Sequence, residues 1–320
     1  MELRNLGTSG LRVSVVGLGC NNLGGRLDGS ASRIVVGAAL NNGITLFDTA
    51  DHYPITAYGK SEELLGDALG RHRADVVIAT KVGLPMDTTG TKRGSSRRYI
   101  MSAVEASLRR LKTDWIDLYQ LHTPDPLTPI EETVCALDDL LTQGKIRYAG
   151  CSNFAAWQVT DAVWTAKSLN RPAFISCQDE YSLLARDIER ELVPAMRAHG
   201  LGFLPYFPLA SGVLSGKYRG GATPAGTRLS TTKGLKEKFL TEENLAAAEA
   251  LAAFAETRGH TLLDLAFSWL LARPTVASVI AGASNLEQVE QNVKAATWTL
   301  TLEDLAEIDK LAPGPVTAAH

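Results

Sequence analysis

Short apolar runs alternate with longer amphipathic segments along most of the chain. The apolar runs contain four to six residues each and lie at residues 13–18, 44–47, 76–80, 116–121, 146–150, 174–177, 202–206 and 276–280. The intervening segments repeat apolar residues at helical spacing. In the first of them, residues 30–41, we expect Ile34, Ala38 and Leu40 to face inward. Short apolar runs predict buried strands, and the spacing between them predicts helices. A strand followed by a helix, repeated along the chain, is typical of a parallel sheet.

Two parts of the chain depart from this repeat. Residues 3–13 hold two short extended pieces around a Gly-Thr-Ser-Gly turn, which predicts an N-terminal β-hairpin. Residues 208–238 are basic, rich in glycine and without a clear period, so we expect a long loop after the seventh strand. A loop of that length inside a compact domain is usually functional.

The strand signals favour one closed (β/α)8 barrel, the TIM-barrel fold, as a single domain over residues 1–320. No linker separates the repeats, and barrels of this class commonly contain about 250 residues or more. An open, doubly wound sheet of seven or eight strands is the alternative.

Composition and charge narrow the classes of partner. The chain is 45% hydrophobic and 21% charged, and its 32 basic and 35 acidic side chains give a net charge of -3 without a long block of one sign. Neither nucleic acid nor a membrane is therefore expected as a partner. Four cysteines without CxxC spacing, and no apolar run near the roughly 20 residues that cross a bilayer, predict a reduced, cytoplasmic protein. We expect a monomer or a small homo-oligomer.

Polar side chains stand where the predicted strands end. A barrel carries its chemistry at the carboxyl ends of its strands. Asp48, Lys81 and His122 follow the second, third and fourth strands, and Tyr53 leaves the same loop as Asp48. The other strand ends supply further polar or small residues, namely Gly19 to Asn22, Ser152, Asn153, Gln178, Tyr206 and Gly282 to Asn285.

Asp48, Tyr53, Lys81 and His122 together suit a proton donor built around a phenol. A free tyrosine has a pKa of about 10, which makes it a weak acid near neutrality. An ammonium group beside the phenol is expected to lower that pKa, and Asp48 would hold Lys81 charged and oriented. His122 would then hydrogen-bond the carbonyl oxygen that receives the proton. Such a set polarises and protonates a C=O group, and it requires a source of hydride.

Each of these residues also has an ordinary structural interpretation. Alone, Asp48 would be a cap or loop-ordering acid, Lys81 a solvated lysine, Tyr53 a rim aromatic and His122 a turn histidine. Their joint occurrence at neighbouring strand ends favours the catalytic hypothesis. Competing motifs are weaker: the GxGxxG fingerprint fails at its third glycine. Asp48, Asp51 and His52 carry side chains that ligate metals, as in barrel hydrolases, but no HxH accompanies them, so a metal site is a minor alternative and no metal is expected.

Several segments resemble the signatures of the aldo-keto reductase family. They are FDTADHY at residues 47–53 with SEELLG at 61–66, ATK at 79–81, DLYQLH at 117–122 and GKIRYAGCSNF at 144–154. The resemblance extends from about Leu3 to Leu311. It implies reversible NAD(P)H-dependent reduction of an aldehyde or ketone on a barrel, without metal. Tyr53 would be the general acid, Lys81 and Asp48 its tuning pair, and His122 the residue that orients the carbonyl.

The same resemblance implies a cofactor site. Ser152, Asn153 and Gln178 would hold the nicotinamide carboxamide, Tyr206 would stack on the ring, and residues 209–217 would cover the pyrophosphate. The expected cofactor set is completed by Gly19, Asn21, Leu209, Ser211, Gly212, Lys217, Arg228, Gly282, Ser284, Gln288 and Asn292. Simple chemistry agrees with these assignments. Amide side chains suit a carboxamide, and Lys217 and Arg228 bring positive charge to phosphates. A helix beginning near Asn285 directs its N-terminal N–H groups at the loop after the eighth strand, where a phosphate would be stabilised.

The sequence departs from the family pattern in two places. Pro54 to Ala57 stand where glycine usually follows the catalytic tyrosine, so Tyr58 is kept as a rival to Tyr53. No lysine or arginine lies between Gly282 and Asn292 to meet a 2′-phosphate, but Ser284, Asn285 and Arg228 would serve, and NADP(H) is favoured over NAD(H). The alternative function is a nicotinamide-binding regulatory or scaffold subunit, similar to the barrel subunits of potassium channels.

Overall fold

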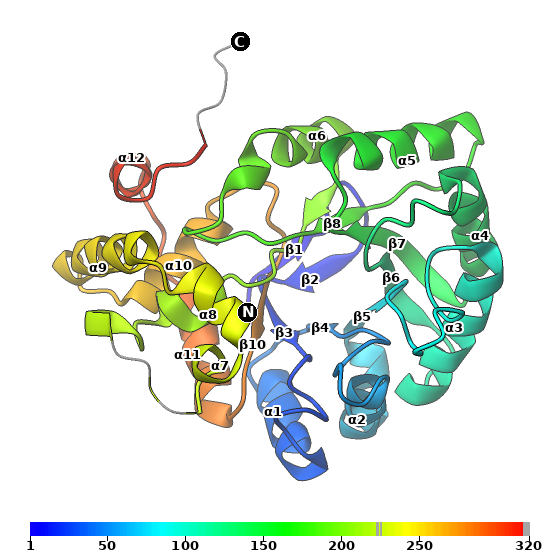
Figure 1. Cartoon of the computed structure of the whole chain (residues 1–320), viewed down its shortest axis with the longest axis horizontal. Helices are drawn as coiled ribbons and strands as arrows, with labels where there is room; N and C mark the ends of the chain where they lie inside the picture. The colour runs from blue at the N-terminus through cyan, green and yellow to red at the C-terminus, as the bar shows by residue number, and fades with distance from the viewer. Residues whose placement is uncertain (222–223, 225, 316–320) are drawn as a thin grey trace.

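A curled parallel sheet forms the centre of the molecule, and helices surround it (Figure 1). The computed structural model describes residues 1–221, 224 and 226–315. In this part of the chain the central sheet has eight strands in the order β10-β3-β4-β5-β6-β7-β8-β9. Their bounds are β3 Val16–Gly19, β4 Leu46–Asp48, β5 Val77–Val82, β6 Ile116–Leu121, β7 Ile146–Ser152, β8 Ser176–Gln178, β9 Gly202–Phe203 and β10 Val279–Gly282.

The ends of this sheet meet and close the barrel. The amide of Phe203 in β9 donates to the carbonyl of Thr275, 2.8 Å away, and the amide of Ala277 donates to the carbonyl of Phe203 at 3.0 Å. These bonds join β9 to the segment that leads into β10. The predicted (β/α)8 barrel is therefore confirmed, and the open doubly wound alternative is wrong.

Helices cover the outside of the barrel. They are α1 Gly29–Asn41, α2 Lys60–Leu69, α3 Arg97–Leu111, α4 Ile130–Thr142, α5 Ala156–Ser168, α6 Leu192–His199, α9 Glu242–Thr257, α10 Leu262–Leu271, α11 Leu286–Ala295 and α12 Leu302–Leu311. The inward face predicted for α1 is partly wrong, because Ile34 is 61% exposed while Val35, Val36 and Ala39 are buried. None of the helices within the described residues has the length and apolar character to span a bilayer.

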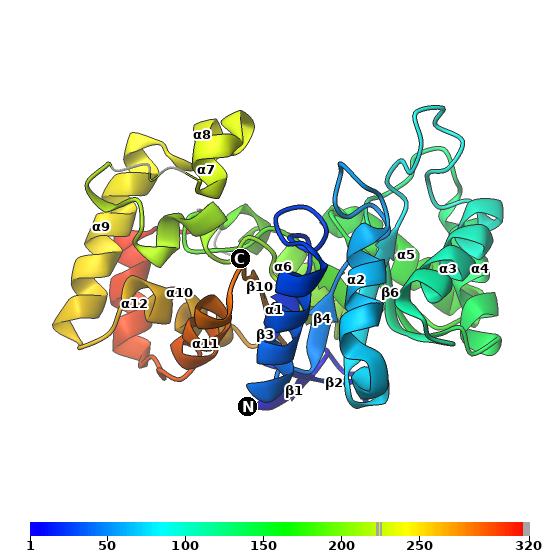
Figure 2. The same ribbon diagram turned by 90° about the horizontal axis from the view of Figure 1, so that it is seen from below.

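The N-terminal hairpin covers the end of the barrel opposite to the carboxyl ends of the strands. Its strands, β1 Leu3–Asn5 and β2 Arg12–Ser14, pair antiparallel as predicted. The apolar run at 13–18 was expected to be one strand, but Val13 belongs to the hairpin and only β3 enters the barrel. Leu6 and Val13 are fully buried in the barrel interior. Figure 2 shows the hairpin on the side opposite to α7 and α8, which leaves the strand ends open for a site.

The predicted loop after the seventh strand contains short helical turns. They are η3 Ala210–Ser215, η4 Arg219–Gly221, α7 Arg228–Thr231 and α8 Lys233–Phe239, and residues 222, 223 and 225 of this loop lie outside the described residues. Leu229 and Phe239 are almost fully buried. These two side chains anchor a segment whose sequence shows no helical period, so the prediction of an irregular loop is only partly correct.

Candidate functional site

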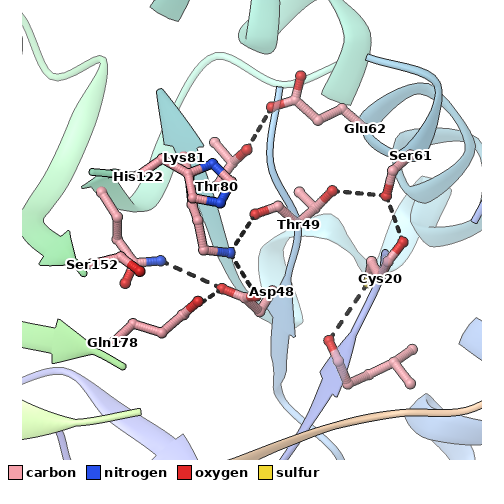
Figure 3. A network of polar contacts seen from close by, with 12 residues as sticks. Cys20, Asp48, Thr49, Ser61, Glu62, Thr80, Lys81, His122, Ser152 and Gln178 are labelled. Carbon is pink, nitrogen blue, oxygen red and sulfur yellow. Dashed lines mark hydrogen bonds and ion pairs between the residues drawn. The ribbon is translucent and has the colours of Figure 1, made fainter. Parts of the chain in front are cut away.

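A buried ion pair between Asp48 and Lys81 lies where β4 and β5 end inside the barrel (Figure 3). Lys81 Nζ donates to Asp48 Oδ2 at 2.7 Å and to the carbonyl of Thr49 at 2.9 Å. Asp48 is 4% exposed and Lys81 is 1% exposed. Burial disfavours the ammonium, but the attraction of Asp48 and Tyr53 outweighs it, so the pKa of Lys81 lies above its ordinary value. The lysine is therefore charged at every physiological pH.

The second oxygen of Asp48 accepts from two amide side chains. Gln178 Nε2, at the end of β8, lies 2.8 Å from Asp48 Oδ1, and Gln120 Nε2, on β6, lies 3.4 Å from it. Gln120 is not among the site residues expected from the sequence. A signal was present, because side chains alternate along a strand and Gln120 follows the inward-facing Leu118 by two residues. Hydrogen bonds from both amides orient the carboxylate toward Lys81.

Tyr53 faces the ion pair from the loop after β4. Its ring centroid is 5.3 Å from Lys81 Nζ and 5.6 Å from the ring of His122, which it meets edge to face. Withdrawal from water raises the pKa of the Tyr53 phenol, and this effect exceeds the lowering by Lys81. The predicted direction of the pKa shift is therefore wrong, although Lys81 acts on the phenol in the expected sense. Burial opposes the phenolate here, and the ammonium only partly offsets it.

His122 supplies a neutral ring at the end of β6. The side chain is 8% exposed, and burial, then repulsion from Lys81 and His52, lowers the pKa of His122 to about 2. A neutral imidazole carries one N–H donor and one acceptor nitrogen. The ring is thus suited to donating a hydrogen bond to a carbonyl oxygen without transferring a proton to it.

Tyr58, the rival to Tyr53, makes different contacts. Its ring is stacked on His52 with centroids 4.6 Å apart, and His52 Nδ1 is hydrogen-bonded to the carbonyl of Pro85 at 2.7 Å. Tyr58 is 42% exposed, and the neighbouring Ile55 is 73% exposed. Tyr53 has the ion-pair contact and Tyr58 has a surface stack, which favours Tyr53 as the acid.

The residues expected around a carboxamide lie together. Asn153 Nδ2 donates to the carbonyl of His122 at 2.9 Å and to Ser152 Oγ at 3.0 Å, while Tyr206 Oη donates to Asn153 Oδ1 at 2.8 Å. Asn153 also has a φ of 61°, a left-handed conformation that asparagine tolerates better than most residues. The amide of Asn153 donates to the carbonyl of Gln178 at 3.2 Å, and Gln178 is bonded to Asp48, so this cluster connects directly to the ion pair.

The segment after Tyr206 is conformationally strained. Phe207, Ala210 and Ser211 have positive φ values of 51°, 45° and 55°, and Gly212 follows at 103°. Ser211 Oγ is buried and, among the described residues, has no hydrogen-bond partner. Leu209 lies in the same turn, half-buried. Strained backbone of this kind clusters at ligand-binding segments, and an unpaired buried hydroxyl is suited to an incoming acceptor.

A cationic group borders this strained segment. Burial and the neighbouring charges of Arg26 and Arg228 lower the pKa of Lys217, and burial and Arg26 lower that of Arg228. The three side chains therefore lie close enough to repel one another. None of them forms an ion pair with a carboxylate in the parts of the chain that the structure covers. An uncompensated cluster of three cations fits a ligand with several negative charges. Arg26 was not expected from the sequence.

The remaining predicted cofactor residues lie at the ends of β3 and β10. Gly19 pairs with Gly282, and a Cβ atom on Gly282 would come within 3.6 Å of Asn21 Oδ1. Gln288 Oε1 accepts from the amide and the hydroxyl of Ser284, at 2.8 and 3.0 Å. These contacts lie at the start of α11, where Asn285 is the N-cap; Asn292, further along the helix, is 6% exposed.

The weak metal alternative gains no support from the geometry. Asp51 is 1% exposed, and burial raises the pKa of its carboxyl well above the ordinary range, with repulsion from Glu62 adding to the effect. Asp48 is bonded to Lys81, and His52 to a backbone carbonyl. Among the described residues, no group of three His, Cys, Asp or Glu side chains is arranged to hold a metal ion.

Comparison with known proteins places this geometry in a family. The model of the "Aldo/keto reductase family" matches residues 15–313. A "probable voltage-gated potassium channel subunit beta" from Arabidopsis thaliana is 38% identical over 302 residues, covering 92% of this chain and 91% of that protein. An "uncharacterized oxidoreductase YrpG" from Bacillus subtilis (strain 168) is 36% identical over 326 residues, covering 98% and 97%.

A further relative carries the name of a reaction. An "L-glyceraldehyde 3-phosphate reductase" from Escherichia coli (strain K12) is 34% identical over 320 residues, covering 97% of this chain and 92% of that protein. The family match includes every strand of the barrel and the loops that carry Asp48, Tyr53, Lys81 and His122. The chain belongs to the aldo/keto reductase family.

Proposed function

We propose that the protein is an oxidoreductase that reversibly transfers a hydride between NADP(H) and the carbonyl group of an aldehyde or ketone. The observation that carries the proposal is the charged Asp48–Lys81 pair directly beside the phenol of Tyr53. A buried ion pair with its own hydrogen-bond donors is expensive to maintain in a barrel core, and a neighbouring phenol gives it a chemical role.

The chain's own residues handle the proton and the carbonyl oxygen. Tyr53 would donate its phenolic proton to the carbonyl oxygen, and the charged Lys81 would stabilise the phenolate that remains. His122, neutral because its pKa is about 2, would donate a hydrogen bond that fixes the direction of the oxygen. Asp48 keeps Lys81 in place through the 2.7 Å bond. The reduced nicotinamide supplies the hydride when it is bound.

The residues present fit a nicotinamide dinucleotide. Ser152, Asn153 and Gln178 offer the donors and acceptors that a carboxamide needs, and Tyr206 offers an aromatic face beside them. The unpaired Ser211 hydroxyl and the cations of Lys217 and Arg228 would bind phosphate oxygens. Ser284, Gln288 and Asn292, with Gly19, Asn21 and Gly282, would hold the adenosine end. We favour NADP(H) because Ser284 and Asn285, together with Arg228, would meet a 2′-phosphate.

A second function is favoured by one specific observation. Two plant proteins that are 38% identical to this chain are named as probable potassium channel β subunits. Relatives of this chain are therefore named as subunits of a larger assembly as well as enzymes. The alternative is therefore a nicotinamide-binding regulatory subunit with slow or no turnover. The ion pair and Tyr53 argue for turnover.

Steady-state turnover distinguishes the two functions. Purified protein would be mixed with NADPH and a panel of aldehydes and ketones, including a short phosphorylated aldehyde, and the loss of reduced-nicotinamide absorbance would be followed. The reverse reaction would use NADP⁺ with the matching alcohols. We expect turnover of at least one aldehyde and tighter binding of NADPH than of NADH. Tight cofactor binding without oxidation across the panel would favour the regulatory subunit, and a clear preference for NADH would refute the choice of NADP(H).

A further inference from the structure

Gln120 occupies a position in the barrel interior that packing alone would give to an apolar residue. It is fully buried on β6, two residues beyond Leu118, which packs with Leu46, Ala79 and Leu204 in the apolar lower part of the barrel. Burying an amide costs free energy unless the amide is hydrogen-bonded. A leucine or methionine would fill the same space without that cost.

The amide of Gln120 is directed at Asp48. Its Nε2 atom lies 3.4 Å from Asp48 Oδ1, a long hydrogen bond to a charged acceptor, while Oε1 has no partner among the residues that the structure describes. The side chain therefore has an unsatisfied Oε1 atom while its Nε2 atom donates to the carboxylate of Asp48. This arrangement indicates that Gln120 serves as a hydrogen-bond donor to Asp48 and not as a packing residue.

The neighbouring strand leaves room for this side chain. Gly150 on β7 is the register partner of Gln120. A Cβ atom on Gly150 would lie 3.3 Å from Gln120 Cγ and only 2.4 Å from Ser176 Oγ on β8. The backbone of Gly150 does not have a positive φ, so its conformation does not require glycine. Glycine is required because a Cβ atom would have no space. The glycine therefore leaves the space that the buried side chains of Gln120 and Ser176 occupy.

Gln120 differs from the other donor to Asp48 in one respect. Gln178 bonds Asp48 at 2.8 Å, but it also belongs to the cluster that we assign to the nicotinamide carboxamide. Its amide is therefore shared between Asp48 and the cofactor. Gln120 is fully buried in the barrel interior and is not part of that cluster. Its bond to Asp48 does not depend on the cofactor.

We propose that Gln120 is a positioning residue for the reductase reaction: its amide holds Asp48 from inside the barrel, so that Asp48 keeps Lys81 directed at Tyr53 throughout turnover. This inference rests on the proposed function. It assigns to β6 a second role besides that of His122, two residues further along the chain. The group that touches the substrate remains Tyr53, and Gln120 acts on it through Asp48 and Lys81.

Two variants of similar shape test the role of the donor. Gln120→Met removes the donor, and Gln120→Glu supplies one only while the introduced carboxyl is protonated. For Gln120→Met we expect kcat to fall about tenfold, the size of one hydrogen bond to a charged group, with KM for NADPH and the carbonyl substrate within twofold of wild type. The deficit should be constant between pH 6 and pH 9. For Gln120→Glu the activity relative to wild type should rise as the pH falls, because the protonated form donates to Asp48 as glutamine does.

Each outcome decides the inference. Wild-type kcat in Gln120→Met, or a Gln120→Glu variant at least as impaired as Gln120→Met at every pH, would overturn it. If Gln120→Met does not fold, the pH profile of Gln120→Glu carries the test alone. If the wild type itself reduces no carbonyl, the proposed function fails. The crystal structure of Gln120→Met then decides the positioning claim, with an Asp48–Lys81 contact longer than 2.7 Å expected and an unchanged contact contradicting it.

Discussion

Replacing Lys81 by methionine removes one charge from a buried pair and leaves the other charge in place. In the Lys81→Met variant the Asp48 carboxylate, in a residue that is 4% exposed, would keep the amides of Gln178 and Gln120 as donors among the described residues. Removing one partner of a buried ion pair destabilises a protein by about 3 to 5 kcal/mol, because the remaining charge is neither solvated nor paired. The thermal midpoint gives the size of the effect.

The unfolding entropy is about 2.1 cal/mol/K per residue, which for 320 residues is about 0.7 kcal/mol/K. A loss of about 3 to 5 kcal/mol should therefore lower Tm by about 4 to 7 °C. Asp48→Asn should have a comparable effect, since it leaves the Lys81 ammonium with the carbonyl of Thr49. The variants would be compared by calorimetry or by circular dichroism at one protein concentration.

The double variant Asp48→Asn/Lys81→Met makes the test specific. It removes both charges at once, so it should be more stable than either single variant, and the two single effects should not add. A Lys81→Met variant with a Tm within 1 °C of wild type would refute the reasoning. So would a double variant whose loss equals the sum of the single losses, because the two charges would then not be coupled.

Three further predictions concern buried groups. Burial raises the pKa of Asp51 well above its ordinary value, so native Asp51 keeps a proton that the unfolded chain releases above about pH 4, and stability falls as the pH rises. Asp51→Asn should reduce that fall, measured by urea titrations at pH 4 and pH 7. His122 acts in the opposite sense, since its low pKa causes stability to fall as the pH drops below about 6.5, and His122→Phe should flatten this slope by about 1.4 kcal/mol per pH unit. Slopes equal to those of wild type would contradict these two predictions. Gly150→Ala should destabilise by about 1 to 3 kcal/mol through the 2.4 Å approach to Ser176 Oγ, and adding Ser176→Ala should restore most of the loss; no recovery would refute that contact.

The barrel could be predicted because each buried parallel strand is a short apolar run with a polar residue after it. The pattern does not define helix phase where apolar residues are abundant. In α1, Val35, Val36 and Ala39 face inward and Ile34 does not, although Ile34 is as apolar as they are. The run at 13–18 also reads as one strand, and only the pairing of Val13 with Arg4 shows that it is two.

The members of the candidate site were readable from the sequence, but the balance of forces among them was not. Lys81 lowers the pKa of Tyr53 as expected, yet burial of the phenol exceeds that effect, and burial depends on the folded loop. Gln120 faces inward by strand alternation, but its acceptor, Asp48, comes from a strand 72 residues away in the chain. Arg26 joins Lys217 and Arg228 only through tertiary packing.

We propose that Tyr53, beside Lys81 and His122, is the acid of a carbonyl reductase. The most direct test is turnover of an aldehyde by Tyr53→Phe, with NADPH affinity measured by fluorescence on the same preparation and Tyr58→Phe as the matched control. We expect Tyr53→Phe to lose about 10²-fold to 10⁴-fold in kcat and to keep its NADPH affinity, while Tyr58→Phe stays within twofold of wild type. Full turnover by Tyr53→Phe, or loss of turnover in Tyr58→Phe, would contradict the role of Tyr53 as the acid.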